Sequence, residues 1–339
     1  MSLTHETVGR SPSRVALIAM VCLVSPVASQ TPPATWVDPS PHARRLVEVA
    51  SGVQVEVLDW GGAGRPLVLL AALGQTAHIY DDWAPRLARD YRVIGITRRG
   101  FGQSSAPPTG YSTERLAQDV LAVISSERLE GPVLVGNGLA GEEMSWIGAH
   151  GSERIAALVY VDAAYDRSRI GGDAAIAGRI PPRLPQSEDM ASAAAVTSWM
   201  SRGIGARLPE AEVRQVLQFG PDGRVAGQRT PSRLQQTVIE ELVRVEPAAI
   251  RVPLLAIYAR DSGSGALPGC TTNEPSIREA CEQLYQWRQQ QVADSTRLFG
   301  SVPPQRRLLD IDGASTFAFL SHEREVTDAL RIFVSELPK

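Results

Sequence analysis

The sequence predicts an α/β fold in which a mostly parallel central sheet has helices on both faces and carries a helical cap insertion. Short, nearly continuous apolar runs alternate with helical stretches, which is the pattern of a parallel sheet buried on both faces. The alternation stops over residues 166–250 and then resumes, which indicates an insertion. With 339 residues, 43% of them hydrophobic and 21% charged, the chain can bury such a core.

The N-terminal residues 1–29 have the pattern of a signal peptide. Arg10 and Arg14 precede an apolar run over 15–24, and small residues follow, with cleavage expected between Ser29 and Gln30. The run is too short to remain as a membrane span, so we expect export to the periplasm or the medium with no stable membrane anchor afterwards. Residues 30–44 are rich in proline and predict an extended lead-in.

The first part of the core is expected over residues 45–165. Residues 45–50 and 53–60 alternate with period two around Ser51 and Gly52, which predicts a hairpin. Helical spacing with capping residues predicts a helix over 83–90, after Asp81 or Asp82, and another over 113–124, after Ser112. The apolar runs that predict parallel strands cover residues 66–72, 91–97, 132–136 and 156–162.

The remaining elements complete the pattern. The insertion contains helical stretches at 210–219 and 233–245, and the second part of the core covers 251–339. Strands are expected at 252–258 and 306–311, and helices around 278–287 and over 324–337. The last helix has a continuous apolar face. A pocket is expected between the insertion and the carboxyl ends of the strands.

The cysteines, the charge and the absence of metal motifs limit the possible partners. In an oxidising compartment Cys270 and Cys281 would form a disulfide, although two unpaired thiols are the alternative. The net charge of −3 gives no reason to expect nucleic acid as a partner. There is no H-E-x-x-H or C-x-x-C motif, so we expect neither a metal nor a cofactor, and a small molecule as the ligand or substrate.

The stretch VLVGNGLAGEE (133–143) supports two interpretations. Gly136, Gly138 and Gly141 have the G-x-G-x-x-G spacing of a dinucleotide site, and Asp162 lies where a ribose-binding acid would follow. A serine in place of Gly138 would instead give the nucleophile turn of a hydrolase. The dinucleotide interpretation predicts an oxidoreductase, although two parallel strands and a hairpin precede this strand.

The second interpretation accounts for more of the chain, which resembles the α/β-hydrolase superfamily, in particular a bacterial group of capped serine hydrolases. The resemblance extends from Val47 to the C-terminus. It is carried by VLLAALGQTAHIYDDWAPRLA (68–88), GITRRGFGQSS (95–105), VLVGNGLAGEE (133–143), ALVYVDAAYD (157–166) and DGASTFAFLSHEREV (312–326). It implies the α/β-hydrolase fold and a Ser-His-Asp site.

The resemblance also implies a role for each position of the site. Gly138 occupies the nucleophile position and Thr316 the base position, so both reacting groups of the triad are replaced. The candidates for the acid are Asp162 and Asp261. The backbone N–H groups of Leu73 and Leu139 would form the oxyanion hole, although Ala71 and Ala72 stand where the fold often has His-Gly.

Three functions follow from these observations. The first is an exported protein of the hydrolase family that lacks Ser-His-Asp catalysis and binds a small apolar ligand in the former active-site pocket, with Asn137 and Tyr80 near it. The second is an active hydrolase of an ester or similar bond, with His78 as a substitute base or water held by Asn137. The third is the dinucleotide-binding oxidoreductase.

Overall fold

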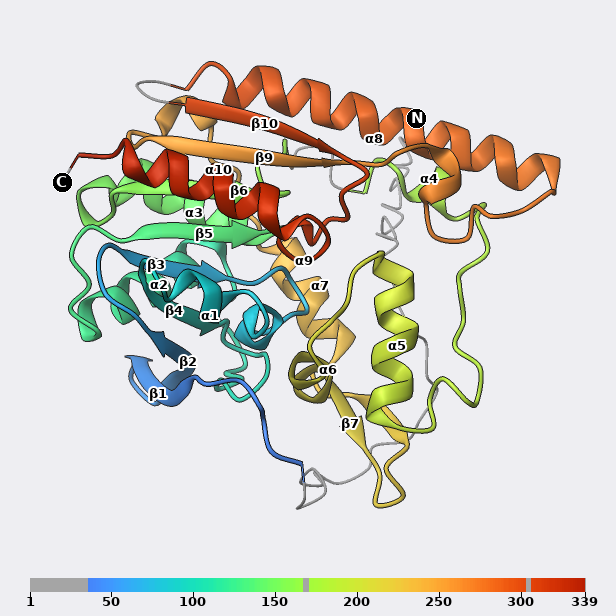
Figure 1. Cartoon of the computed structure of the whole chain (residues 1–339), viewed down its shortest axis with the longest axis horizontal. Coiled ribbons are helices and arrows are strands. Elements are labelled where there is room, and N and C mark those ends of the chain that lie inside the picture. Colours follow the sequence, from blue (N-terminus) through green and yellow to red (C-terminus); the bar gives the residue numbers. More distant parts are fainter. Residues whose placement is uncertain (1–35, 167–170, 303–305, 339) are drawn as a thin grey trace, which may run out of the picture.

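An eight-stranded sheet runs through the centre of the molecule in the computed structural model, which describes residues 36–166, 171–302 and 306–338. The expected signal peptide lies outside the described residues. The strands are β1 (Ala43–Ala50), β2 (Val53–Gly61), β3 (Pro66–Leu70), β4 (Arg92–Thr97), β5 (Val133–Asn137), β6 (Ala157–Val161), β9 (Leu254–Arg260) and β10 (Arg306–Asp312). Their order is β1-β2-β4-β3-β5-β6-β9-β10 (Figure 1). The β1–β2 hairpin joins β4 in antiparallel fashion, and the strands from β4 to β10 are parallel.

Apolar residues of the parallel strands pack on both faces of the sheet. Leu67 and Leu69 of β3 belong to one buried cluster, whereas Val68 and Leu70 belong to the other. Both clusters contain residues of flanking helices, as the continuous apolar runs predict. The helices of the core are η1 (Ala77–Tyr80), α1 (Ala84–Leu87), α2 (Thr113–Ser126), α3 (Ala140–His150), η2 (Ser152–Arg154), η5 (Ser264–Ala266), α8 (Pro275–Phe299), α9 (Ala318–Ser321) and α10 (Glu323–Ser335).

Two of the core helices differ from the prediction. The helix expected over 83–90 is the single turn α1, whose N-cap residue is Trp83, and Asp81 and Asp82 do not cap it. Asp81 instead ends η1, and its carboxylate faces His78. The helix expected around 278–287 extends over 275–299, because Val292 and Phe299 in its later turns pack in the buried core.

The insertion between β6 and β9 lies beside the carboxyl ends of the parallel strands (Figure 1). Its elements are α4 (Ala174–Ala177), α5 (Ala193–Ile204), α6 (Glu210–Val216), β7 (Leu217–Phe219), β8 (Val225–Gln228), α7 (Ser232–Glu240) and η4 (Pro247–Ala249). The insertion is mainly helical, as predicted, but it also contains the short hairpin of β7 and β8. The helix expected over 210–219 ends at Val216, because the next three residues pair with β8 around a tight turn in which Gly223 has a φ of +76°.

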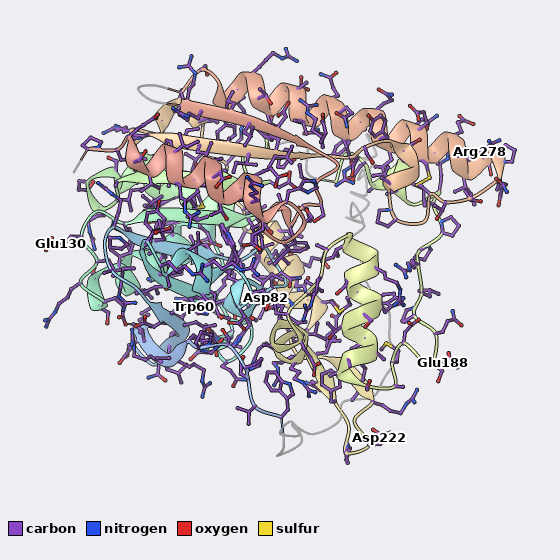
Figure 2. All side chains as sticks on the ribbon, viewed as in Figure 1. Trp60, Asp82, Glu130, Glu188, Asp222 and Arg278 are labelled. Atoms are coloured by element: carbon purple, nitrogen blue, oxygen red, sulfur yellow. A yellow bond between two sulfur atoms is a disulfide. The ribbon has the colours of Figure 1, made fainter. Side chains whose placement is uncertain are left out.

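The disulfide between Cys270 and Cys281 is present, with a Cα–Cα distance of 5.8 Å. It joins the loop after η5 to the first turns of α8. In Figure 2 it lies near the end of α8 that carries Arg278. Both half-cystines are buried against Ile180 of the insertion, so the bridge fixes this end of α8 where it meets the insertion. None of the helices in the described part of the chain is both long and apolar enough to cross a membrane.

Candidate functional site

The turn between β5 and α3 holds the position at which the resemblance places a nucleophile. β5 ends at Asn137 and α3 begins at Ala140, so Gly138 and Leu139 connect them. Gly138 has a φ of +56°, which glycine adopts without steric cost. A Cβ at this position would lie 3.0 Å from the Cβ of Ala72 and 3.6 Å from its Cα. Ala72 therefore occupies part of the space that a side chain at position 138 would need.

The other two glycines of the motif permit close packing. Gly136 lies within β5, and a Cβ there would collide with the Sδ atom of Met144. A Cβ on Gly141 would collide with the carbonyl oxygen of Ala163, so this glycine lets α3 approach the chain that follows β6. The first glycine lies in a strand and not in a loop, and β5 is not the first strand of the parallel sheet. The dinucleotide interpretation therefore finds no support in the fold.

One side-chain amide connects the three expected positions of the triad. The Nδ2 group of Asn137 donates to the carbonyl oxygens of Val161 and Thr316, each at 2.7 Å. Asn137 directly precedes Gly138, and Val161 directly precedes Asp162, so positions 138, 162 and 316 lie around this amide. Asn137 is buried, and its Oδ1 atom accepts no hydrogen bond from the residues that the structure describes.

Both candidate acids are held by neighbouring groups. The carboxylate of Asp162 accepts hydrogen bonds from the Tyr165 hydroxyl and from the N–H of Ala259, the latter at 3.2 Å. Asp261, directly after β9, forms an ion pair with Arg288 at 3.2 Å. Burial and the charge of Asp162 raise the pKa of Asp261, against the effect of Arg288. Position 316 has no imidazole, and both carboxylates instead bind the neighbouring groups named above.

The two expected oxyanion donors, Leu73 and Leu139, lie in the turns that follow β3 and β5. Leu73 and Gly74 are the central residues of a turn closed by a 3.1 Å hydrogen bond from the Gln75 N–H to the Ala72 carbonyl. Gly74 has a φ of +87°, which this turn needs at its third residue. In the described part of the chain, the N–H groups of Leu73 and Leu139 donate to no other protein group. They are therefore available to an acceptor.

Helix α7 of the insertion covers these two donors with an apolar cluster, which we call the cap cluster. Its buried members include Phe101, Leu139 and Val238, and Leu73 and Leu234 pack against them. Phe101 comes from the R-x-G-F-G motif after β4, and Leu234 and Val238 come from α7. Side chains from the core and the insertion thus pack together beside the turn between β5 and α3, which we call the elbow.

Both ring nitrogens of His78 face carboxylates, at hydrogen-bond distance for Nδ1 and at ion-pair distance for Nε2. Its Nδ1 lies 2.9 Å from Asp81 and 3.1 Å from Asp38, and its Nε2 lies 3.7 Å from Glu56. Burial alone would lower the pKa of this imidazole, but the hydrogen bonds to these three carboxylates raise it to about 12. The geometry therefore gives no support to His78 as a base at Gly138.

Tyr80, the other expected pocket residue, is part of the core. Its hydroxyl donates to the Leu70 carbonyl at 2.8 Å, and its ring packs against Trp83 and Phe319. Burial raises the pKa of the Tyr80 hydroxyl. The side chain thus anchors η1 to β3 and is not exposed to a pocket.

Sequence reasoning missed two buried carboxyl groups that hold the loops of the site. Glu143 of α3 pairs with Arg98 at 2.5 Å, and Arg98 also donates to the Ala71 carbonyl at 3.2 Å. Glu212 of α6 accepts the Thr76 N–H at 3.0 Å and the Thr76 hydroxyl, and burial raises its pKa to about 8. Each of these glutamates lies among apolar residues at helical spacing, and this position in the sequence could have indicated that its carboxyl group is buried.

The arrangement of sheet, elbow and insertion is that of the α/β-hydrolase class. Residues 65–208 match the family model described as alpha/beta hydrolase fold. The described chain therefore has the α/β-hydrolase fold, and its residues 65–208 are similar to the family of that name.

The individual relatives are distant. A non-heme haloperoxidase of Rhodococcus erythropolis is 29% identical over 148 residues, which cover 42% of this chain and 47% of that protein. A 2-hydroxy-6-oxo-6-(2'-aminophenyl)hexa-2,4-dienoic acid hydrolase of Metapseudomonas resinovorans is 32% identical over 129 residues, covering 37% of this chain and 44% of that one. The chain thus spans about half the length of these curated relatives. The structure of an E-2-(acetamidomethylene)succinate hydrolase is similar, with a TM-score of 0.64 and 16% identity, covering 87% of this chain and 99% of that one.

Proposed function

We propose that this chain is an exported α/β-hydrolase-family protein that does not carry out Ser-His-Asp acyl transfer and binds a small apolar molecule beneath α7. The observation that carries the proposal is the pair of residues Gly138 and Thr316. Glycine has no side chain with which to form an acyl-enzyme, and a threonine hydroxyl cannot accept a proton at neutral pH. The φ of +56° at Gly138 and the hydrogen bond from the Asn137 amide to the Thr316 carbonyl support a turn and a last loop that do not need these reacting groups.

Two features support binding at this position. The N–H groups of Leu73 and Leu139 can donate to one acceptor oxygen of a ligand, and the cap cluster supplies an apolar surrounding for the rest of it. Because α7 packs directly on this cluster, entry of a ligand requires α7 to move away from the core. The signal-peptide pattern at residues 1–29 and the disulfide support export.

A serine-directed fluorophosphonate probe tests the loss of acyl transfer. The purified protein should not be labelled, and the variant Ala72→Gly/Gly138→Ser/Thr316→His is the positive control, with a restored nucleophile and base. Stoichiometric labelling of the wild type beside Leu139 would contradict the proposal.

Binding of the fluorescent probe anilinonaphthalene sulfonate tests the ligand site. We expect saturable binding at one site that is lost in Leu234→Trp, because the larger ring fills the cap cluster. Ile332→Trp is the matched control, since Ile332 is exposed on α10. Equal binding by the two variants would exclude the cap cluster as the site.

A second candidate is an active hydrolase with a non-standard catalytic group. The observation in its favour is the Oδ1 atom of Asn137, which is buried beside the elbow and could accept a hydrogen bond from an attacking water. Residual catalysis by an oxyanion hole and binding alone reaches about 10³–10⁴-fold over water. A rate of p-nitrophenyl ester hydrolysis clearly above that range would favour this candidate.

A further inference from the structure

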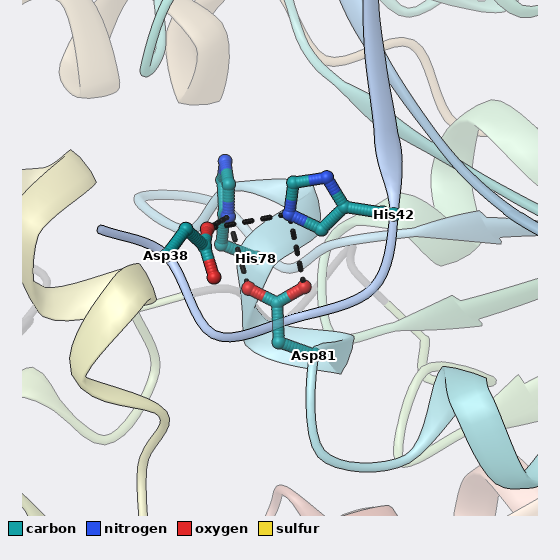
Figure 3. Close-up of side chains that lie close together, drawn as sticks. All are labelled: Asp38, His42, His78 and Asp81. Atoms are coloured by element: carbon teal, nitrogen blue, oxygen red, sulfur yellow. Dashed lines mark hydrogen bonds and ion pairs between the residues drawn. The ribbon is translucent and has the colours of Figure 1, made fainter.

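Two histidines and two aspartates meet at the start of the described chain, away from the elbow. Asp38 and His42 lie in the segment before β1, whereas His78 belongs to η1 and Asp81 follows it (Figure 3). One ligand atom of each residue, taken together, lies within 4.8 Å of the other three. We call this group the His/Asp cluster.

Four nitrogen–oxygen distances within the cluster are close to those between two ligands of one metal ion. His42 Nε2 is 3.3 Å from Asp38 Oδ2 and 3.5 Å from Asp81 Oδ1. His78 Nδ1 is 3.1 Å from Asp38 Oδ2 and 2.9 Å from Asp81 Oδ2. Nitrogen and oxygen ligands bound tetrahedrally at about 2.0–2.1 Å from a zinc ion lie about 3.3 Å apart. A single ion could therefore contact all four residues with only small side-chain shifts.

Burial makes the cluster unlike a surface ion pair. The side chains of His42, His78 and Asp81 are 7%, 2% and 4% exposed, and that of Asp38 is 21% exposed. The Oδ1 atom of Asp81 is buried without a hydrogen-bond partner among the described residues, and it faces His42. A cation between them would satisfy this oxygen, which is otherwise costly to bury.

Glu56 lies behind the ring of His78, at ion-pair distance from it and just beyond hydrogen-bond distance. The Nε2 atom of His78, on the other side of the ring, is 3.7 Å from Glu56, whose second carboxylate oxygen accepts the Thr97 hydroxyl at 2.9 Å. A carboxylate behind a ligating imidazole orients the ring and makes it a better ligand. The ring of His42 is held edge-on by Trp60, at 5.6 Å between centroids.

We propose that Asp38, His42, His78 and Asp81 form a structural binding site for a divalent transition-metal ion of the zinc class. Two imidazole nitrogens and two carboxylate oxygens suit zinc, cobalt or nickel, whereas magnesium and calcium prefer six or more oxygen ligands. The protein supplies all four ligands, which is typical of a structural and not a catalytic zinc site. The ion would fasten the segment before β1 to the loop that follows β3. This inference is independent of the proposed function at the elbow.

Metal analysis of the full chain, expressed without a histidine tag and stripped with a chelator, tests the proposal. We expect binding of one Zn²⁺ per chain, a rise in Tm on adding Zn²⁺ but not Mg²⁺ or Ca²⁺, and the strong visible absorption of tetrahedral Co²⁺ when Co²⁺ is added. Substoichiometric Zn²⁺ binding with no Co²⁺ spectrum would show that the cluster is an ion-pair network only.

Variants locate the ion. His42→Ala and Asp38→Asn should each weaken Zn²⁺ binding more than about 100-fold, since loss of an outer partner alone costs about 10–100-fold. Both residues lie before β1 and outside the central sheet, so these variants are expected to fold, which circular dichroism checks. His150→Ala, at an exposed histidine of α3, is the matched control and should bind like the wild type. Equal Zn²⁺ binding by His42→Ala and His150→Ala would overturn the assignment.

Discussion

Replacing Gly138 by serine should destabilise the fold, and the loss should depend on residue 72. The new Cβ would lie 3.0 Å from the Ala72 Cβ, which is closer than the ordinary carbon–carbon contact of about 3.5–4.0 Å. Overpacking of this kind costs about 1–3 kcal/mol. The backbone at position 138, with a φ of +56°, adds about 1–2 kcal/mol for a residue with a Cβ. We expect Gly138→Ser alone to lower the free energy of unfolding by about 2–5 kcal/mol.

The Ala72→Gly background separates the contact from the backbone strain. Without the Ala72 methyl group, Gly138→Ser should cost only about 1–2 kcal/mol, which leaves a coupling of about 1–3 kcal/mol between the two positions. Urea unfolding of the wild type, the two single variants and the double variant measures this coupling, provided that the m-values agree.

A matched control is Gly52→Ser. Gly52 has a φ of +69°, and a Cβ there would meet nothing within 4 Å, so it reports the backbone cost alone and should not depend on residue 72. An equal cost of Gly138→Ser in both backgrounds would refute the contact with Ala72 as its cause.

Three further predictions concern the polar groups around the site and the disulfide. Glu212 has a folded-state pKa of about 8, above the ordinary value of 4.5, so the folded state keeps a proton that the unfolded state loses between these values. The stability that this group contributes is complete below about pH 4.5 and is lost as the pH rises to about 8. Between about pH 6 and 8, the free energy of unfolding in urea should fall by about 1–2 kcal/mol less in Glu212→Gln than in the wild type. Parallel pH curves for the two proteins would contradict this. Asn137→Leu removes two buried donors and should lower the free energy of unfolding by about 2–4 kcal/mol, whereas a loss below about 0.5 kcal/mol would mean that water replaces the amide. Cys270→Ser/Cys281→Ser removes a disulfide between residues 11 positions apart and should lower the free energy of unfolding by about 2–3 kcal/mol, measured by thermal unfolding. An unchanged Tm would show that the disulfide does not stabilise the fold.

The parts of the fold that the sequence predicts are those with strong local patterns. Ser112 caps α2 as expected, with its hydroxyl accepting the Arg115 N–H at 3.3 Å. The apolar face expected for the last helix is buried at Val326, Leu330 and Phe333. In both cases the residues that decide the structure are close in the sequence, so periodicity and capping suffice.

The elements that the sequence did not predict depend on distant partners. The helical pattern over 210–219 continues past Val216, but pairing with β8 turns its last three residues into a strand. The His/Asp cluster likewise combines Asp38 and His42 with residues of η1, because the order β1-β2-β4-β3 brings the two segments together. The spacings Asp-x-x-x-His and His-x-x-Asp were visible, but each alone is common, and only the fold places them side by side.

Ala72, Gly138 and Thr316 are physically connected around the elbow. The methyl group of Ala72 fits because position 138 has no Cβ, and a Cβ at position 138 fits only if Ala72 gives way. Thr316 is fixed to the same turn through the Asn137 amide, which binds its carbonyl oxygen and leaves its side chain out of the link. The positions of the turn and of the last loop therefore do not depend on a serine or a histidine. Under the proposed function, this arrangement allows the scaffold to persist without a serine or a histidine. A serine introduced at position 138 alone would first meet the methyl group of Ala72.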